Sequence, residues 1–252
     1  MKILIIFPLA TSAYNPDVIE EAKTVAAPDT EISVINLDQG PQSIESRYEE
    51  FLAIPDLIKK SQAAEQDGFD GILIDCFGEP GVEIIRELID IPVVGGFNPA
   101  VLTATLISQK FSIITVEKRV ISMLETLARD VGITENIASI RDVGIPVSEL
   151  PDKNRLIAAL VEESQKAIAR DGAQAIVLGC TGMLGVANDV KSILYELGMP
   201  APVIDPTTTA ITFLESLIRN KLSQSRLTYY KPAQQQEQQK TGLVKSWHFR
   251  PI

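Results

Sequence analysis

Two stretches of the chain repeat each other closely, and this repeat limits the possible folds more than any other feature. The first is DGFDGILIDCFGEPGV at 67–82, and the second is DGAQAIVLGCTGMLGV at 171–186. Aligning them superposes Cys76 on Cys180, and these are the only cysteines in the chain. A repeat that spans a strand, a glycine turn and the start of a helix indicates two copies of one α/β unit.

Short β-rich segments alternate with longer helical ones along most of the sequence. Segments such as GILIDC and AIVLGC are almost continuously apolar, which is typical of parallel strands buried on both faces. We therefore expect an α/β fold of two pseudo-symmetric domains, each a parallel four-stranded sheet flanked by helices. The strands are expected at 2–7, 31–37, 71–76, 91–97, 111–116, 137–143, 175–180 and 201–206, and the helices at 15–27, 46–67, 80–89, 99–109, 117–131, 150–171, 184–197 and 207–224.

The repeat also sets the expected domain boundaries. IPVVGGFNPA matches APVIDPTTTA, so each half contains four strands. We expect residues 1–97 and the last helix, 207–224, to form the first domain, and residues 98–206 to form the second. The segment 225–252 is rich in Gln and lacks apolar periodicity. We expect it to be disordered, with docking of its aromatic end as the alternative.

Composition excludes several classes of protein. The 252 residues carry a formal net charge of −10 and no cluster of Lys and Arg, so nucleic acid is not an expected partner. No segment reaches the roughly 18 apolar residues of a membrane span, and the N-terminus lacks the cleavage site of a signal peptide. Two cysteines are too few for a disulfide framework, so we expect a cytoplasmic protein with free thiols.

Each cysteine is expected at the carboxyl end of a parallel strand, where open α/β sheets bind their ligands. The glycine turn and helix that follow direct N–H groups and the positive helix end toward the sulfur, which favours the thiolate. Two thiols that face one cleft from opposite sides can remove a proton from one face of a carbon and return it to the other. We therefore expect Cys76 and Cys180 to be the catalytic pair of a two-base racemase.

Other residues near the strand ends are expected to bind substrate. An enolate needs hydrogen-bond donors, which the N–H groups of the two turns and the Thr181 hydroxyl can supply. Thr11, Ser12 and Thr115 follow the first strand of each half, and their hydroxyls suit either a substrate or a turn equally well. The expected substrate-binding residues are Thr11, Ser12, Phe77, Gly78, Thr115, Thr181 and Gly182.

This mechanism needs a small-molecule substrate but no metal and no other cofactor. The only histidine, His248, lies in the polar C-terminal segment, so neither a His-based triad nor a His metal site is expected. Three alternatives remain: buried structural cysteines, a non-catalytic ligand-binding protein, and a decarboxylase or isomerase that uses one cysteine. The equivalent positions of the two cysteines favour the racemase.

At these residues the chain resembles the aspartate/glutamate/hydantoin racemase superfamily, and most closely its hydantoin and allantoin racemases. The resemblance runs from MKILIIFPLATS through DCFGEPGV, FSIIT and LGCTGM to PVIDPTTTA, and CFGEPG and GCTGM are its most specific parts. It implies two pseudo-symmetric α/β domains, cofactor-independent racemisation, and catalytic cysteines at Cys76 and Cys180. It also implies a five-membered cyclic ureide as substrate. We further expect a homo-oligomer.

The chain departs from hydantoin racemases at the expected pocket. FPLATS stands where those enzymes usually have NPNTS, and GGFNPA stands where a more acidic segment is expected. These differences predict the same chemistry in an altered pocket. Asp75 and Glu79 flank Cys76, and we interpret both as structural, because a free carboxylate there raises the thiol pKa.

Overall fold

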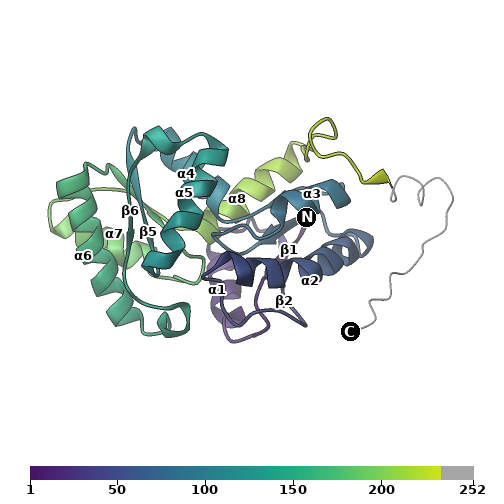
Figure 1. The fold of residues 1–252 in the computed structure, drawn as a ribbon, viewed down its shortest axis with the longest axis horizontal. Coiled ribbons are helices and arrows are strands. Elements are labelled where there is room, and N and C mark those ends of the chain that lie inside the picture. Colours follow the sequence, from purple (N-terminus) through teal and green to yellow (C-terminus); the bar gives the residue numbers. More distant parts are fainter. Residues whose placement is uncertain (234–252) are drawn as a thin grey trace.

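The computed structural model describes residues 1–233, which form two similar α/β domains side by side (Figure 1). Each domain contains a parallel four-stranded sheet with helices on both faces. The strands are β1 (Lys2–Phe7), β2 (Glu31–Asn36), β3 (Gly71–Ile74), β4 (Val93–Val94), β5 (Phe111–Thr115), β6 (Ile137–Asp142), β7 (Ala175–Leu178) and β8 (Val203–Ile204). The α-helices are α1 (Asn15–Val25), α2 (Arg47–Gln66), α3 (Val82–Leu88), α4 (Phe97–Ile107), α5 (Ile121–Val131), α6 (Lys153–Asp171), α7 (Ala187–Glu196) and α8 (Pro206–Arg219). Short 3₁₀ helices lie at η1 (Lys118–Val120), η2 (Thr134–Asn136) and η3 (Val147–Glu149).

The first sheet has the strand order β2-β1-β3-β4. In its centre β1 pairs with β3, from Ile3 opposite Gly71 to Ile6 opposite Ile74. Alternate side chains point to opposite faces, which gives two buried layers. One layer joins β1 and β3 to α1 and α8, and the other joins them to α2 and α3.

The second sheet repeats this arrangement with the order β6-β5-β7-β8. Here β5 pairs with β7, from Phe111 opposite Ala175 to Ile114 opposite Leu178. Both sheets therefore place the strand that precedes a cysteine next to the first strand of its domain. The carboxyl ends of β3 and β7 are equivalent positions in the two domains.

Each domain is completed by a helix that follows the last strand of the other domain. Helix α4 follows β4 but packs on β7, with Phe97, Val101 and Ala104 buried in the core of the second domain. Helix α8 follows β8 but packs on α1, β3 and β4 of the first domain. The two exchanged helices also pack against each other, so the sequence halves are joined by an extensive interface.

The expected fold class is confirmed, but the fourth strand of each sheet is shorter than expected. These strands are only Val93–Val94 and Val203–Ile204, shorter than the expected 91–97 and 201–206. Only these residues pair with β3 and β7. Pro92 and Pro202 precede them and lack an N–H group, so each proline joins the ladder only through its carbonyl oxygen, which accepts the N–H of Ile72 at 3.0 Å or of Ile176 at 2.8 Å.

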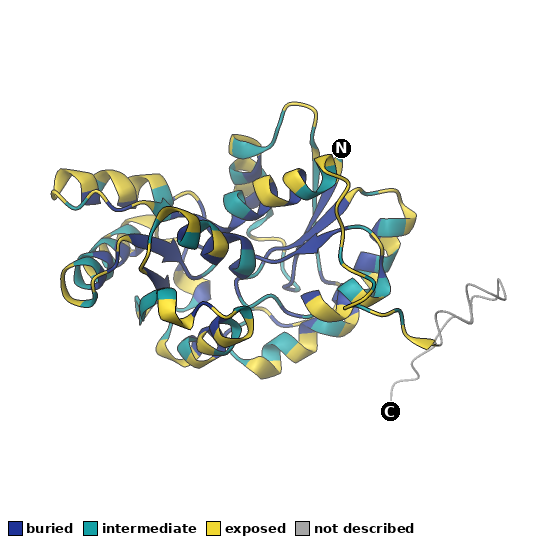
Figure 2. Cartoon of the chain, turned by 90° about the horizontal axis from the view of Figure 1, so that it is seen from above, coloured by how far each residue is buried: buried dark blue, intermediate teal, exposed yellow. Residues whose placement is uncertain are grey.

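Burial follows the two sheets. Figure 2 shows the strands as the buried centre of each domain, while exposed residues occupy the outer faces of the helices. None of the helices in the described residues 1–233 is long and apolar enough to span a membrane.

The chain after α8 runs back over the first domain. The Arg226 guanidinium donates to the carbonyl oxygen of Arg86 at 2.8 Å and pairs with Asp90 at 2.7 Å. The Arg86 guanidinium lies 5.6 Å from the centre of the Tyr229 ring. This differs from the disorder expected from residue 225 onward, because charged groups hold the segment where apolar burial does not. The aromatic end expected to dock, and His248, lie outside the described residues.

Candidate active site

Cys76 and Cys180 lie two residues beyond β3 and β7, in turns of the same shape. The carbonyl oxygen of Cys76 accepts the N–H of Glu79 at 3.1 Å, and the carbonyl oxygen of Cys180 accepts the N–H of Met183 at 3.2 Å. Both cysteines are free thiols and both residues are partly exposed. The internal repeat of the sequence is therefore also a repeat of local structure.

The two turns contact each other across the domain interface. The Thr181 hydroxyl donates to the carbonyl oxygen of Asp75 at 3.0 Å, and each of these residues adjoins a cysteine. Gly96 permits this approach, because a Cβ there would lie 2.9 Å from Thr181 Cγ2 and 3.3 Å from the carbonyl oxygen of Cys76. The Gly96 N–H donates to that same carbonyl oxygen at 3.2 Å. The cysteine turns therefore meet where the domains meet.

Burial raises the pKa of both thiols. The pKa of Cys180 is raised to about 12 by burial, although the Gly182 N–H, 3.4 Å from the sulfur, lowers it. Burial also raises the pKa of Cys76 well above its ordinary value; the Gly78 N–H opposes this shift, and the charge of Cys180 adds to it. The expectation that the turns lower the thiol pKa is therefore wrong in its net result, because desolvation outweighs the N–H groups.

Side chains of the first domain hold the backbone of Val147 in the second domain. Glu45 Oε1 accepts the Val147 N–H at 2.8 Å, and the Tyr14 hydroxyl donates to the Val147 carbonyl oxygen at 3.1 Å. Glu45 also forms a close ion pair with Arg119 of the second domain. Burial, and then the charges of Cys180 and Glu45, raise the pKa of Tyr14, which locates its phenol near that thiol.

These contacts were not predicted from the sequence. Tyr14 and Glu45 lie in the loops that follow β1 and β2. Such loops leave the same edge of a parallel sheet as the cysteine turn, and this is the signal that could have identified them.

The two carboxyl groups that flank Cys76 both accept hydrogen bonds from the protein. Asp75 is fully buried; its Oδ1 accepts the Thr207 hydroxyl at 2.9 Å, while its Oδ2 has no partner in the described structure. Burial raises its pKa to about 7. Glu79 accepts the backbone N–H of Asn98 at 2.8 Å and also its side-chain amide at 2.5 Å. Both groups therefore connect the cysteine turn to the start of a helix.

Some of the expected site residues lie in the cysteine turns, and others lie in the loop after β1. Gly78 and Gly182 adjoin the thiols, and Thr181 joins the two turns. Thr11 and Ser12 lie in the loop after β1, where the Thr11 hydroxyl accepts the N–H of Ala13 at 3.3 Å. These two remain candidates for substrate contact.

Two expected site residues are instead part of the protein interior. Thr115 is fully buried, and its hydroxyl donates to the carbonyl oxygen of Gly179, the residue between β7 and Cys180, at 3.0 Å. Phe77 is also buried, and its ring packs edge-on against Phe97 with centroids 5.2 Å apart. Thr115 supports the strand end before Cys180, and Phe77 packs the domain interface.

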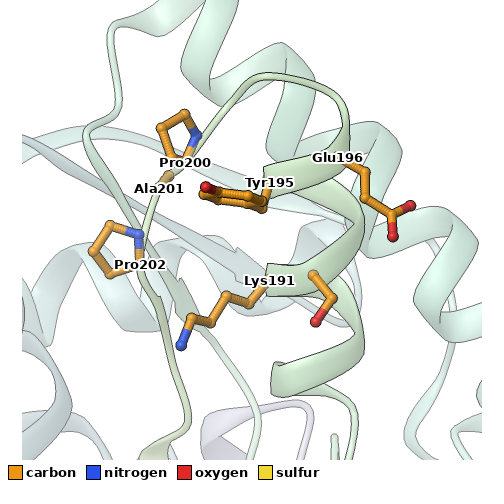
Figure 3. Close-up of a pocket in the computed structure, with 7 residues that line it drawn as sticks. Lys191, Tyr195, Glu196, Pro200, Ala201 and Pro202 are labelled. Carbon is orange, nitrogen blue, oxygen red and sulfur yellow. The ribbon is translucent and has the colours of Figure 1, made fainter.

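The surface hollow drawn in Figure 3 lies at the end of the second sheet opposite to the cysteine turns. It has a volume of about 540 Å³ and lies between α7 and the chain that enters β8. The cysteines follow the carboxyl ends of strands, whereas this hollow precedes the amino end of one. It is lined by Lys191, Ser192, Tyr195, Glu196, Pro200, Ala201 and Pro202. Within residues 1–233, no group of three or more His, Cys, Asp and Glu side chains could hold a metal ion.

Fold and site together define a class of protein with two similar α/β domains that bring a cysteine each to their interface. A family model described as "Asp/Glu/Hydantoin racemase" matches residues 3–214. The chain belongs to this family, and it is accordingly an isomerase of the racemase type.

Individual relatives cover nearly the whole chain. The hydantoin racemase of Pseudomonas sp. (strain NS671) is 35% identical over 94% of this chain and 94% of that protein. The hydantoin racemase of Paenarthrobacter aurescens is 37% identical over 94% of this chain and 99% of that protein. Among solved structures, allantoin racemase from Pseudomonas fluorescens superposes with a TM-score of 0.86 at 32% identity, over 92% of this chain and 97% of that chain.

Proposed function

We propose that the protein is a cofactor-independent racemase that inverts the acidic ring carbon of a cyclic ureide, with Cys76 and Cys180 as its two bases. One observation carries the proposal: two equivalent cysteine turns meet at the domain interface and are linked by Thr181 and Asp75. Two-base racemisation needs an acid/base group on each face of one carbon. A thiol at each of two equivalent turns that meet at the domain interface supports this assignment.

The proposed reaction conserves every proton. A Cys76 thiolate removes the proton from the ring carbon, and the electron pair of the broken C–H bond moves into the adjacent carbonyl to form an enolate. The Cys180 thiol then gives its proton to the opposite face, and its sulfur becomes the thiolate. The other enantiomer follows the same steps in reverse. The N–H groups of Gly78 and Gly182, which adjoin the sulfurs, are the candidate donors to the enolate oxygen.

The substrate class follows from the acidity of the carbon and from the relatives. The adjacent carbonyl acidifies the ring carbon of a hydantoin, whereas a carbon beside an ionised carboxylate is harder to deprotonate. Burial raises both thiol pKa values, and a thiolate of high pKa is a strong base for a weak carbon acid. The hydantoin racemases and allantoin racemases among the similar proteins support a ring of this kind.

The deciding experiment follows single enantiomers of allantoin and of 5-substituted hydantoins in deuterium oxide. We expect loss of optical rotation together with deuterium incorporation at the stereocentre. Cys76→Ser and Cys180→Ser should each abolish racemisation, while exchange of one enantiomer, different in the two variants, survives. Unchanged racemisation in both variants would exclude the cysteine pair, and a wild type inactive on every ureide would exclude the substrate class.

A further inference from the structure

Glu50 places a carboxylate beside the thiol of Cys76. It lies in the first turn of α2, which begins after Ser46, whose hydroxyl accepts the N–H of Glu49. A Cβ added to Gly78 would lie 2.7 Å from Glu50 Oε1 and 3.7 Å from Cys76 Sγ. The missing side chain at Gly78 therefore leaves the space in which carboxylate and sulfur come together. The charge of Glu50 accordingly contributes to raising the pKa of Cys76.

This carboxylate is largely buried but accepts no hydrogen bond from the described residues. Its side chain is 14% exposed, and within residues 1–233 the cation paired with it is Arg47, 3.9 Å away and itself exposed. Burial raises the pKa of Glu50. A carboxylate that has lost water without gaining a donor is unfavourable, and a ligand that brings a donor removes that cost.

The neighbouring carboxylates differ from Glu50 in this respect. Glu45 accepts the Val147 N–H and pairs with Arg119. Glu79 accepts two hydrogen bonds from Asn98. Asp75 accepts the Thr207 hydroxyl at one oxygen, and its other oxygen lacks a donor, but the residue is fully buried. Among the four carboxyl groups around the cysteine turns, Glu50 is thus the one that accepts no hydrogen bond from the described residues.

We propose that Glu50 recognises the substrate by accepting the ring N–H that adjoins the reacting carbon. This inference rests on the proposed function and specifies its substrate class. In a hydantoin ring the stereocentre lies between N1–H and the C4 carbonyl, so a thiolate at that carbon has N1–H within its immediate surroundings. A carboxylate beside the thiolate meets this donor and forms a charge-assisted hydrogen bond. The same charge repels substrates that carry an ionised carboxylate next to the reacting carbon.

The test measures binding without turnover. Unsubstituted hydantoin, 1-methylhydantoin and 3-methylhydantoin are compared for their ability to protect Cys76 from iodoacetamide, with labelling at that residue read by mass spectrometry. The two methyl isomers have the same size and differ in which N–H is blocked. For the wild type we expect 1-methylhydantoin to bind at least about tenfold more weakly than 3-methylhydantoin, the loss typical of a hydrogen bond to a charged group.

Two variants test whether the preference for 3-methylhydantoin over 1-methylhydantoin depends on Glu50. Glu50→Gln should weaken hydantoin binding by about tenfold and reduce the difference between the methyl isomers. Glu125→Gln removes a carboxylate from an exposed position on α5 and should leave both quantities unchanged. The comparison of methyl isomers on the wild type tests the proposal even if Glu50→Gln does not fold.

The outcomes separate this inference from the proposed function. Equal protection by the methyl isomers, unchanged discrimination in Glu50→Gln, or no protection by hydantoin would each overturn the role of Glu50. Discrimination at N1 in an enzyme that racemises no ureide would retain Glu50 as the N–H acceptor and reject the racemase proposal. Racemisation of ureides without discrimination at N1 would retain the racemase proposal and reject the role of Glu50.

Discussion

The Thr181 hydroxyl donates a 3.0 Å hydrogen bond to the carbonyl oxygen of Asp75, and the two residues adjoin the two cysteines of the chain. Thr181 is buried, so this bond forms away from bulk water. It ties the end of β7 to the end of β3 and fixes the cysteine turns relative to each other. The separation of the two thiols therefore depends on one side-chain contact as well as on the packing of the domains.

Thr181→Val should keep the shape of this contact and remove the hydrogen bond. The Asp75 carbonyl then loses a buried donor, which costs about 1–3 kcal/mol of the free energy of unfolding. We expect kcat/KM for racemisation to fall as the thiols lose their alignment. Urea unfolding and polarimetry on the same samples measure both effects. Thr181→Ser keeps the hydroxyl but removes the methyl group that lies against Gly96, so a loss in Thr181→Ser without a loss in Thr181→Val would attribute the effect to the methyl contact and reject the hydrogen bond.

The two bonds to Val147 should differ in strength. Tyr14→Phe removes a neutral hydrogen bond at the domain interface, worth about 0.5–1.5 kcal/mol, whereas Glu45→Gln removes a charge-assisted bond and the ion pair with Arg119. We expect hydrogen exchange at the Val147 amide to accelerate more in Glu45→Gln. Tyr48→Phe, on a side chain in α2 that is 71% exposed, is the control and should change nothing. Faster exchange in Tyr14→Phe than in Glu45→Gln would contradict this order.

The rate of racemisation should rise with pH well beyond neutrality. Burial favours the neutral form of both thiols, so the free enzyme near pH 7 holds both protons and only a small fraction carries the one thiolate that catalysis needs. That fraction grows about tenfold per pH unit until the lower thiol pKa is reached. The pH profile of kcat/KM measures this rise. Iodoacetamide labelling of each cysteine is an independent probe of thiolate formation. A plateau at or below neutral pH would show that the thiols are more acidic in solution.

Asp75 should make the protein less stable as pH rises from about 4 to about 7. Burial raises its pKa from 3.8 to about 7, so the folded state holds a proton that the unfolded state releases in this range. The stabilisation is complete below pH 3.8 and lost once pH passes the folded-state pKa, a change on the order of a few kcal/mol. Urea unfolding at several pH values should show a smaller decline in Asp75→Asn than in the wild type.

A pair of buried carboxyl groups should also lower the free energy of unfolding as pH rises. Glu21 and Asp205 share a hydrogen bond, and burial together with mutual repulsion raises the pKa of Glu21 to about 8. Asp75→Asn should therefore reduce the slope but not remove it. An unchanged slope would mean that Asp75 ionises in the folded protein as easily as in the unfolded chain.

The sequence predicts the fold because local patterns determine it. The apolar strands, the glycine turns and the repeat around Cys76 and Cys180 are all visible within short windows, and they place both cysteines at equivalent strand ends. The strand order β2-β1-β3-β4 and its repeat in the second sheet were not predicted. The short fourth strands and the later starts of α5 and α7 also required the structure.

The surroundings of the thiols were harder to predict because they depend on contacts between distant residues. Tyr14, Glu45 and Glu50 reach the cysteine turns from helices and loops whose sequence shows only ordinary polar residues. Thr115 shows the opposite case: it has a suitable hydroxyl at a suitable strand end, but that hydroxyl is buried and donates to the carbonyl oxygen of Gly179. The net thiol pKa was also missed, because a turn motif indicates N–H donors but not the extent of desolvation.

The exchange of α4 and α8 bears on how such a chain could arise. A half-length chain with this topology would leave the face of its sheet next to β3 without a cover, because the covering helix comes from the other half. Two copies of that half-length chain could satisfy each other by trading their last helices. A symmetric swapped dimer is thus the simplest ancestor, and gene duplication with fusion would convert its two identical thiols into Cys76 and Cys180, free to diverge.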